Sequence, residues 1–361
     1  MKAAVLRQLK TPLSIEELRV PPLGLGQVRV RMQLAAICHS QRLEVSGGRG
    51  LDTFLPHLIG HEGVGVVEEI GPGVTKVRPG DQVVLSWIRG SGLAGGPVIY
   101  ASEQGPVNAG PIATFCESPI VAEQCVTKID PPVDPAMAVL AGCAIPTGAG
   151  AVLNAMPPVL DGSLCIFGAG GVGLAAVCGA VLAGWKQIIV ADMRQPRLER
   201  ALALGATQTL HIGTDDVETF AARLPGKGFD LVIECAGDAA AMEEAIWVAK
   251  PEGGRVVIVG NLESGRTIAV DPFDLIEGRV LTGSWGGGIA PDVDIPRCVR
   301  WAAEGAINYQ LLMGKRFALD QVNEAMQALG GDEPGRPILE CAMMADATAS
   351  YAQATRSAGV S

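Results

Sequence analysis

The stretch Ser163-Leu164-Cys165-Ile166-Phe167-Gly168-Ala169-Gly170-Gly171-Val172-Gly173 decides the fold of this 361-residue chain. Its first five residues predict a short buried strand, and a helix is predicted from Val172 to Ala183. Between them, the residues from Gly168 to Gly173 form the pattern G-x-G-x-x-G. Such glycines let the backbone approach a pyrophosphate, and a helix N-terminus offers free N–H groups to it. The stretch therefore predicts a dinucleotide-binding turn.

An acidic residue supports this interpretation. Asp192 ends the next predicted strand, about 20 residues beyond the last glycine, where an acid accepts the hydroxyls of the adenosine ribose. Its charge disfavours a 2′-phosphate, which predicts NAD rather than NADP. Arg194 and Arg197 weigh against that preference, because an arginine can accept the phosphate.

The predicted elements change character along the chain. Up to residue 145, short strand-like runs alternate with Gly/Pro turns, which is typical of a β-barrel-like domain. Over residues 146–286, strands alternate with helices, which predicts a doubly wound parallel sheet. Residues 287–361 have a mixed pattern and are expected to return to the first domain. They end in a tail, after Met343, that we expect to be poorly ordered. The predicted class is α/β plus β.

Composition excludes several classes of protein. The net charge of −10 argues against binding to nucleic acid or to anionic membranes. The N-terminus lacks a signal-peptide core, and the longest uncharged run, residues 135–160, is broken by glycines and prolines. Nine cysteines in a chain of this length are not a disulfide framework. We therefore expect a cytoplasmic protein with reduced thiols.

Three residues offer metal-ligand chemistry. Cys38, His61 and Cys143 make up the Cys₂His set of a catalytic zinc site with an open fourth position. Their spacings are not those of a compact metal motif. On spacing alone, buried cysteines and a hydrogen-bonded histidine explain the three residues equally well.

These motifs together resemble the zinc-dependent medium-chain alcohol dehydrogenases. The resemblance implies a GroES-like catalytic domain, completed by the C-terminal segment, with an inserted Rossmann domain, and zinc held by Cys38, His61 and Cys143. Cysteine at the third ligand position is similar to the branch that contains the animal, plant and glutathione-dependent formaldehyde dehydrogenases. The matching segments, which lie between about Lys2 and Leu339, are Cys38-His39-Ser40, Gly60-His61-Glu62-Gly63, Arg78 to Val83, Gly142-Cys143 with Thr147-Gly148, Phe167 to Gly173, Asp192, Gly278-Arg279 and Gly283-Ser284.

The resemblance also implies roles at the reacting end. Ser40 accepts the hydroxyl proton of the substrate and passes it towards the cofactor ribose. Glu62 lies behind the zinc and ligates it transiently, and Trp87 lines the substrate pocket.

Further residues are implied to bind the cofactor. His39 and Arg336 contact the pyrophosphate, and Thr147 touches the nicotinamide. Arg197 is also expected to bind the cofactor, near the ribose. The fingerprint residues complete the expected cofactor site: Gly168, Gly170, Gly171, Val172, Gly173 and Asp192.

The chain departs from the family pattern at three places. The segment Trp87–Gly96 lacks the four cysteines that hold a second, structural zinc in many members. Gln41 stands where an acid usually supports the zinc histidine, and Leu43 stands where a histidine often ends the proton relay. The proton then leaves through the ribose hydroxyl and water, or by another side chain such as Glu44.

The sequence thus predicts a zinc-dependent alcohol dehydrogenase that transfers a hydride between an alcohol and NAD, with an aldehyde or ketone as the product. The alternative is a zinc-containing, NAD(P)H-dependent reductase of an activated C=C bond or an iminium. A third hypothesis, a cofactor-binding structural or regulatory protein without enzymatic activity, requires an incomplete set of metal ligands. Here Cys38, His61 and Cys143 are all present. The expected partners are a small alcohol or aldehyde and a second copy of the chain, with a homotetramer as the alternative to a homodimer. Family habit assigns the contact between subunits to the segment Val280–Trp285.

Overall fold

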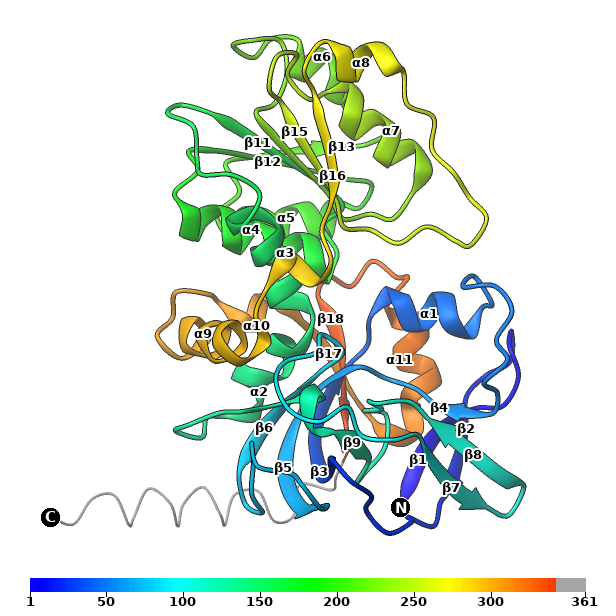
Figure 1. The fold of residues 1–361 in the computed structure, drawn as a ribbon. Coiled ribbons are helices and arrows are strands. Elements are labelled where there is room, and N and C mark those ends of the chain that lie inside the picture. Colours follow the sequence, from blue (N-terminus) through cyan, green and yellow to red (C-terminus); the bar gives the residue numbers. More distant parts are fainter. Residues whose placement is uncertain (342–361) are drawn as a thin grey trace, which may run out of the picture.

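The protein is described by a computed structural model that covers residues 1–341. The tail predicted after Met343 therefore lies outside the described residues. Within them, a parallel-sheet domain stands above a β-rich domain, and α3 (Ala144–Leu153) lies where the two meet (Figure 1). The predicted boundary between residues 145 and 146 falls inside this helix.

The upper domain is built on a six-stranded sheet with the order β13-β12-β11-β14-β15-β16, in which every neighbouring pair is parallel. This confirms the predicted Rossmann-like sheet. Its strands are β11 (Ser163–Phe167), β12 (Gln187–Asp192), β13 (Gln208–His211), β14 (Leu231–Glu234), β15 (Arg255–Ile258) and β16 (Val280–Gly283).

Helices connect these strands. The predicted fingerprint helix is α4, and the next helix, α5, begins at Gln195 with Pro196 accommodated in its first turn. The helices of this domain are α4 (Gly171–Ala183), α5 (Gln195–Ala203), α6 (Val217–Ala221), α7 (Ala239–Trp247) and α8 (Pro272–Ile276).

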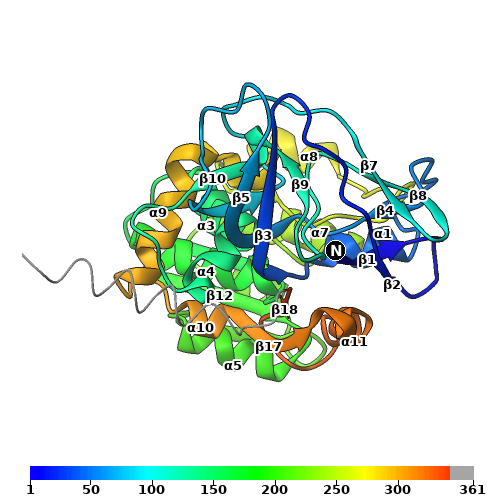
Figure 2. The same cartoon turned by 90° about the horizontal axis from the view of Figure 1, so that it is seen from below.

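The lower domain contains two mostly antiparallel sheets (Figure 2). One has the order β2-β1-β4-β8-β7, and the other has the order β10-β6-β5-β3-β18-β17, with β9 also paired to β3. The strands are β1 (Lys2–Leu6), β2 (Ser14–Glu17), β3 (Gln27–Ala36), β4 (His57–Leu58), β5 (Glu62–Ile70), β6 (Gln82–Ser86), β7 (Val98–Ser102), β8 (Gly105–Ala109), β9 (Ile120–Ala122), β10 (Val126–Lys128), β17 (Met313–Ala318) and β18 (Arg336–Glu340).

The C-terminal segment completes this lower domain. Strand β18 pairs with β3 through Ile338 and Ala36, although these residues are far apart in the chain. The remaining helices and 3₁₀ turns are α1 (His39–Val45), η1 (Glu123–Cys125), α2 (Pro135–Ala138), η2 (Val139–Gly142), η3 (Gly286–Gly288), α9 (Pro291–Ala303), α10 (Tyr309–Leu312), η4 (Leu319–Gln321) and α11 (Val322–Ala328).

The segment that lacks the four cysteines is held by carboxylates instead. Glu123 is 1% exposed, and its oxygens accept N–H bonds from Thr75 (2.6 Å), Lys76 (2.8 Å) and Leu93 (2.8 Å). Asp292 of α9 accepts the N–H of Ser91 (2.7 Å) and pairs with Lys76. These bonds fix the segment without a metal ion.

Among the described residues, no single helix is both long and apolar enough to cross a bilayer. The pair α2–η2 and α3 passes that test only when joined across a bend of 61°.

Candidate active site

The three predicted metal ligands converge from separate elements. Cys38 precedes α1, His61 precedes β5, and Cys143 lies between η2 and α3. One sulfur or nitrogen atom from each lies within 4.8 Å of the others. Tetrahedral zinc with Zn–S bonds of about 2.3 Å needs donor atoms at such separations. Tertiary structure thus brings the Cys₂His set together.

The unpaired nitrogen of His61 fits a metal. The side chain of Gln41 contacts Nδ1 of His61, while its Oε1 accepts the N–H of Cys38 at 2.7 Å. The other ring nitrogen, Nε2, is buried and has no hydrogen-bond partner. A buried polar atom without a partner is costly, and a bound metal ion removes that cost. Gln41 therefore orients His61 as its sequence position implies.

A buried ion pair lies behind the sulfurs. Arg336 contacts Glu62 with one amino group and donates to Cys38 Sγ at 3.3 Å with the other. Glu62 is fully buried, and its second oxygen accepts the N–H of Ala144 at 2.8 Å. Burial raises the pKa of Glu62, although Arg336 and the Ala144 N–H oppose the shift.

The two thiols are electrostatically unequal. A hydrogen bond from Cys143 and the charge of Arg336 hold the pKa of Cys38 well below its usual range, although burial opposes this. The bond shared with Cys38, together with burial, raises the pKa of Cys143. Cys38 is thus prepared to be a thiolate, the form that binds metal.

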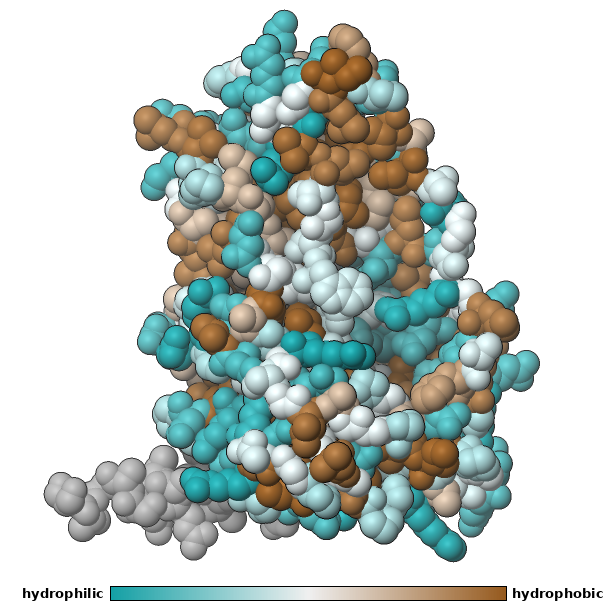
Figure 3. Space-filling view, in the orientation of Figure 1, coloured by the Kyte–Doolittle hydropathy of each residue, from teal (hydrophilic) through white to brown (hydrophobic). Residues whose placement is uncertain are grey.

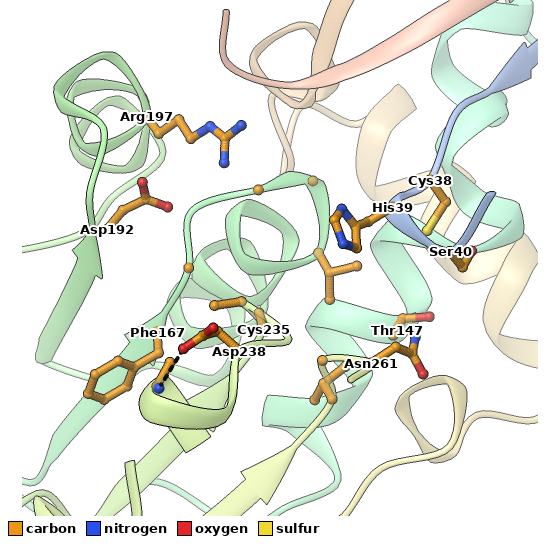
Figure 4. A pocket seen from close by; sticks show the side chains of 18 of the residues that line it. Cys38, His39, Ser40, Thr147, Phe167, Asp192, Arg197, Cys235, Asp238 and Asn261 are labelled. Carbon is orange, nitrogen blue, oxygen red and sulfur yellow. Dashed lines mark hydrogen bonds between the residues drawn. The ribbon is translucent and has the colours of Figure 1, made fainter. Parts of the chain in front are cut away.

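A cavity of about 580 Å³ extends from Cys38 to the glycine-rich turn (Figure 4). Cys38, His39 and Ser40 line one part of it, and Asp192 and Arg197 line another. A Cβ at Gly170 would meet no atom within 4 Å, whereas one at Gly173 would lie 1.7 Å from the carbonyl oxygen of Gly168. Gly170 therefore leaves room for a ligand, and Gly173 allows the turn to close on itself.

Two hydroxyl groups in the cavity have no partner. Ser40 Oγ and Thr147 Oγ1 are both buried without a hydrogen bond. Such atoms at a cavity wall are suited to a ligand that supplies the missing partners. His39 lines the same cavity, and burial lowers its pKa, so its ring is a neutral donor at neutral pH.

The acid predicted from the fingerprint lies at the end of β12. Asp192 is 7% exposed and accepts N–H bonds from Ala169 (2.7 Å) and Arg194 (2.8 Å). Its carboxylate therefore ties the glycine-rich turn to the start of α5 while facing the cavity.

Trp87, predicted from the family pattern, is anchored at the metal site. Its Nε1 donates to Cys143 Sγ at 3.2 Å. Trp285, which sequence reasoning missed, meets it edge to face at a centroid distance of 4.9 Å and is 79% exposed. Its only sequence signal was its place at the end of the segment Val280–Trp285, which was expected at the contact between subunits. The two indoles form an aromatic wall next to the metal ligands.

Cys235 and Asn261 also line the cavity, and sequence reasoning assigned neither to it. Cys235 is partly exposed, because it follows the carboxyl end of β14, where a doubly wound sheet opens towards its ligand. His57 lies outside the metal cluster, with its Nε2 bonded to Asp52 at 2.9 Å.

Family models match both domains. Residues 24–131 match the alcohol dehydrogenase GroES-like domain, and residues 171–304 match the zinc-binding dehydrogenase domain. Zinc and a nicotinamide cofactor belong to this family, and the orphaned His61 nitrogen and the open glycine turn fit them.

Curated relatives match along almost the whole chain. Alcohol dehydrogenase class-3 of Myxine glutinosa is 31% identical over 94% of this chain and 97% of its own length. S-(hydroxymethyl)glutathione dehydrogenase of Photobacterium damsela subsp. piscicida is 32% identical over 94% and 99%.

Solved structures agree. Benzyl alcohol dehydrogenase from Acinetobacter calcoaceticus superposes with a TM-score of 0.84 at 27% identity, covering 94% of this chain and 99% of that one. A zinc-binding dehydrogenase from Sinorhizobium meliloti 1021, bound to NADP, gives 0.77 at 25% identity over 94% and 98%. The chain therefore belongs to the zinc-dependent medium-chain alcohol dehydrogenase family.

Proposed function

We propose that this protein oxidises small alcohols with NAD as the hydride acceptor, and reduces the corresponding aldehydes or ketones in reverse. One observation carries the proposal: Cys38, one member of the Cys38–His61–Cys143 cluster, lines the same cavity as the glycine-rich turn. A substrate oxygen at the cluster and a nicotinamide held by the turn then share one space. That arrangement supplies the proximity that hydride transfer needs.

The chain's residues divide the chemistry. When bound, zinc supplies Lewis-acid polarisation of the alcohol oxygen. Ser40 Oγ, buried and without a partner, accepts the hydroxyl proton and releases its own towards the cofactor ribose and water. When bound, the nicotinamide would supply the acceptor for the hydride of the carbinol carbon, and Thr147 of α3 would lie beside it. Gln41 keeps His61 oriented throughout.

Other residues hold the cofactor. The glycine-rich turn receives the pyrophosphate, with His39 as a neutral donor beside it. Arg336 brings positive charge to the same place: a Cβ at Gly171 would lie 2.9 Å from its Nε. Asp192 accepts the ribose hydroxyls and repels a 2′-phosphate, which favours NAD.

The experiment is a side-by-side assay of the zinc-loaded protein. NAD reduction is followed with ethanol, hexanol and benzyl alcohol, and NADH oxidation with an enal, a cyclic iminium and benzaldehyde. Alcohol oxidation at a rate well above the enal and iminium rates supports the proposal. Turnover of only the enal or iminium would favour the reductase alternative. Leu43, which is buried at the usual position of the proton relay, supports that alternative.

The proposed cellular form is a cytoplasmic homodimer, with a homotetramer as the alternative. In the described part of the chain, β16 is the last strand of its sheet, and Val280 in it is partly exposed. Phe273, Leu275 and Ile276 of α8 are exposed beside it, where Figure 3 shows hydrophobic side chains gathered near the top of the molecule. An exposed apolar patch next to a free strand edge favours pairing with a second copy. Light scattering coupled to size exclusion tests this assembly.

A further inference from the structure

Three arginines, one at the N-cap of α5 and two within it, contact a segment from the C-terminal part of the chain. Arg194, Arg197 and Arg200 are spaced by three residues and so lie along one side of the helix. Arg200 Nη1 donates to the carbonyl oxygens of Met313 (2.9 Å) and Pro334 (2.9 Å). These bonds tie the dinucleotide-binding domain to the segment before β18.

The other two arginines belong to the cavity. Arg197 Nη2 donates to the carbonyl oxygens of Leu329 (3.3 Å) and Gly331 (3.2 Å), and Arg194 Nη1 is paired with the carboxylate of Asp332. Arg194 and Arg197 both line the cavity beside Asp192. Figure 4 shows Arg197 and Asp192 together, away from Cys38 and Ser40.

These contacts bear on the choice between NAD and NADP, which the sequence left open. In dinucleotide-binding folds, an acid at the end of the second strand selects NAD, whereas a nearby arginine accommodates the 2′-phosphate of NADP. This chain carries both, with Asp192 and Arg194 two residues apart. Because Asp332 pairs with Arg194, a 2′-phosphate has to compete with that carboxylate for the guanidinium.

We propose that Asp332 is a specificity-determining residue that acts through Arg194. Its carboxylate holds the guanidinium away from the position of a 2′-phosphate and adds negative charge beside it. The segment Leu329–Asp332 thus contacts Arg194 and Arg197, which line the adenosine end of the pocket, and biases that end towards NAD. This inference rests on the NAD preference proposed above.

The size of the effect follows from exposure. The Asp332 side chain is 77% exposed and that of Arg194 is 38% exposed. Exposed ion pairs contribute little, so Asp332 biases the choice by about two- to fivefold rather than fixing it. Asp192, which is nearly buried, carries the larger share. A phosphate monoester with close to two negative charges competes well for Arg194 once Asp332 is neutralised.

The test uses Asp332→Asn in the zinc-loaded, full-length protein. We expect the ratio of kcat/KM with NADP to kcat/KM with NAD to rise two- to fivefold. In parallel, the inhibition constant of 2′,5′-ADP should fall relative to that of 5′-ADP by a similar factor. Both changes should shrink at 0.5 M salt, where exposed charges are screened. Adding Arg194→Ala should abolish the gain, because the proposed phosphate partner is then absent.

Asp320→Asn is the matched control. Asp320 is likewise an exposed acid in an exposed ion pair, with Lys2 at 3.0 Å, but Lys2 does not line the cavity, whereas Arg194, the partner of Asp332, does. An unchanged cofactor ratio in Asp332→Asn, or an equal change in Asp320→Asn, would overturn the inference.

The outcome is separable from the proposed function. If the unaltered protein prefers NADP, the proposed NAD preference fails, and Asp332 is still judged by the change in ratio. If no alcohol is oxidised with either cofactor, the proposed function fails. The affinities of 2′,5′-ADP and 5′-ADP, measured as direct binding by calorimetry, then test the role of Asp332.

Discussion

Arg336 is ion-paired with Glu62 in the interior, and the same guanidinium lies 3.3 Å from the sulfur of Cys38. Arg336 is 3% exposed and Glu62 is fully buried. Burial alone would lower the pKa of Arg336, but Cys38 and Glu62 beside it raise that pKa further above its usual value. One cation therefore serves a metal-binding thiolate and a buried carboxylate at the same time.

Replacing Arg336 tests this relationship. Arg336→Met leaves Glu62 as an unpaired buried carboxylate, so the free energy of unfolding should fall by about 3–5 kcal/mol. Arg316→Met is the control, because Arg316 pairs with Glu340 at the surface and should cost no more than about 1 kcal/mol. Denaturant titration of both variants measures the difference, and equal losses would contradict a special role for the buried pair.

Removing one metal ligand should empty the site but leave the dinucleotide pocket in place. Cys143→Ala is expected to lose bound zinc, measured by elemental analysis, together with alcohol oxidation. NADH binding should persist, because the glycine-rich turn follows β11, whereas Cys143 lies between η2 and α3. Cys178→Ala, which changes a buried cysteine in α4, should keep its zinc. Alcohol oxidation at the original rate by Cys143→Ala would refute the zinc assignment.

The hydroxyl of Ser40 should matter for proton transfer. Ser40→Ala removes the unpaired Oγ, and kcat/KM for the alcohol should fall by roughly 10²-fold or more. Ser40→Thr, which keeps a hydroxyl, should retain much of the rate. The pH profile of kcat/KM and its solvent isotope effect provide the readout. A profile and isotope effect that are identical in the alanine variant would show that the proton takes another route.

Glu123 should make the segment Trp87–Gly96 sensitive to acid. Burial raises the pKa of Glu123, but N–H bonds from Leu93, Thr75 and Lys76 outweigh it and hold the pKa below its usual value. A carboxyl whose pKa is lowered in the folded state stabilises that state above the unfolded pKa of about 4.5. The contribution is lost as the pH falls through the folded value.

Glu123→Gln should therefore be less stable than the parent by about 1.5–3 kcal/mol at pH 7, because it loses charged hydrogen bonds. The gap should narrow below about pH 4.5, where the carboxyl protonates in the unfolded chain before it does in the folded parent. Urea titrations from pH 3.5 to 7 measure it. A gap that stays constant with pH would show that Glu123 acts through shape and not through charge.

The sequence alone determined the elements that depend on local backbone chemistry. The glycine pattern from Gly168 to Gly173 specified a strand, a turn and a helix, because only glycine fits the close approach of Gly173 to Gly168. Alternation of strands and helices likewise specified a parallel sheet, and resemblance supplied the three metal ligands. The sequence also showed that the segment Trp87–Gly96 lacks the four cysteines of a structural zinc site, because the absence of a residue type can be read directly from the sequence.

Tertiary structure decided which distant residues share a site. Arg336 was expected at the pyrophosphate, and only packing revealed its bond to Glu62, since β18 must first pair with β3. Trp285 meets Trp87, Glu123 accepts the N–H of Leu93, and Asp332 meets Arg194, all between residues that are not neighbours in the chain. No local pattern encodes such pairs, because their free energy depends on burial and geometry that exist only once both domains have folded.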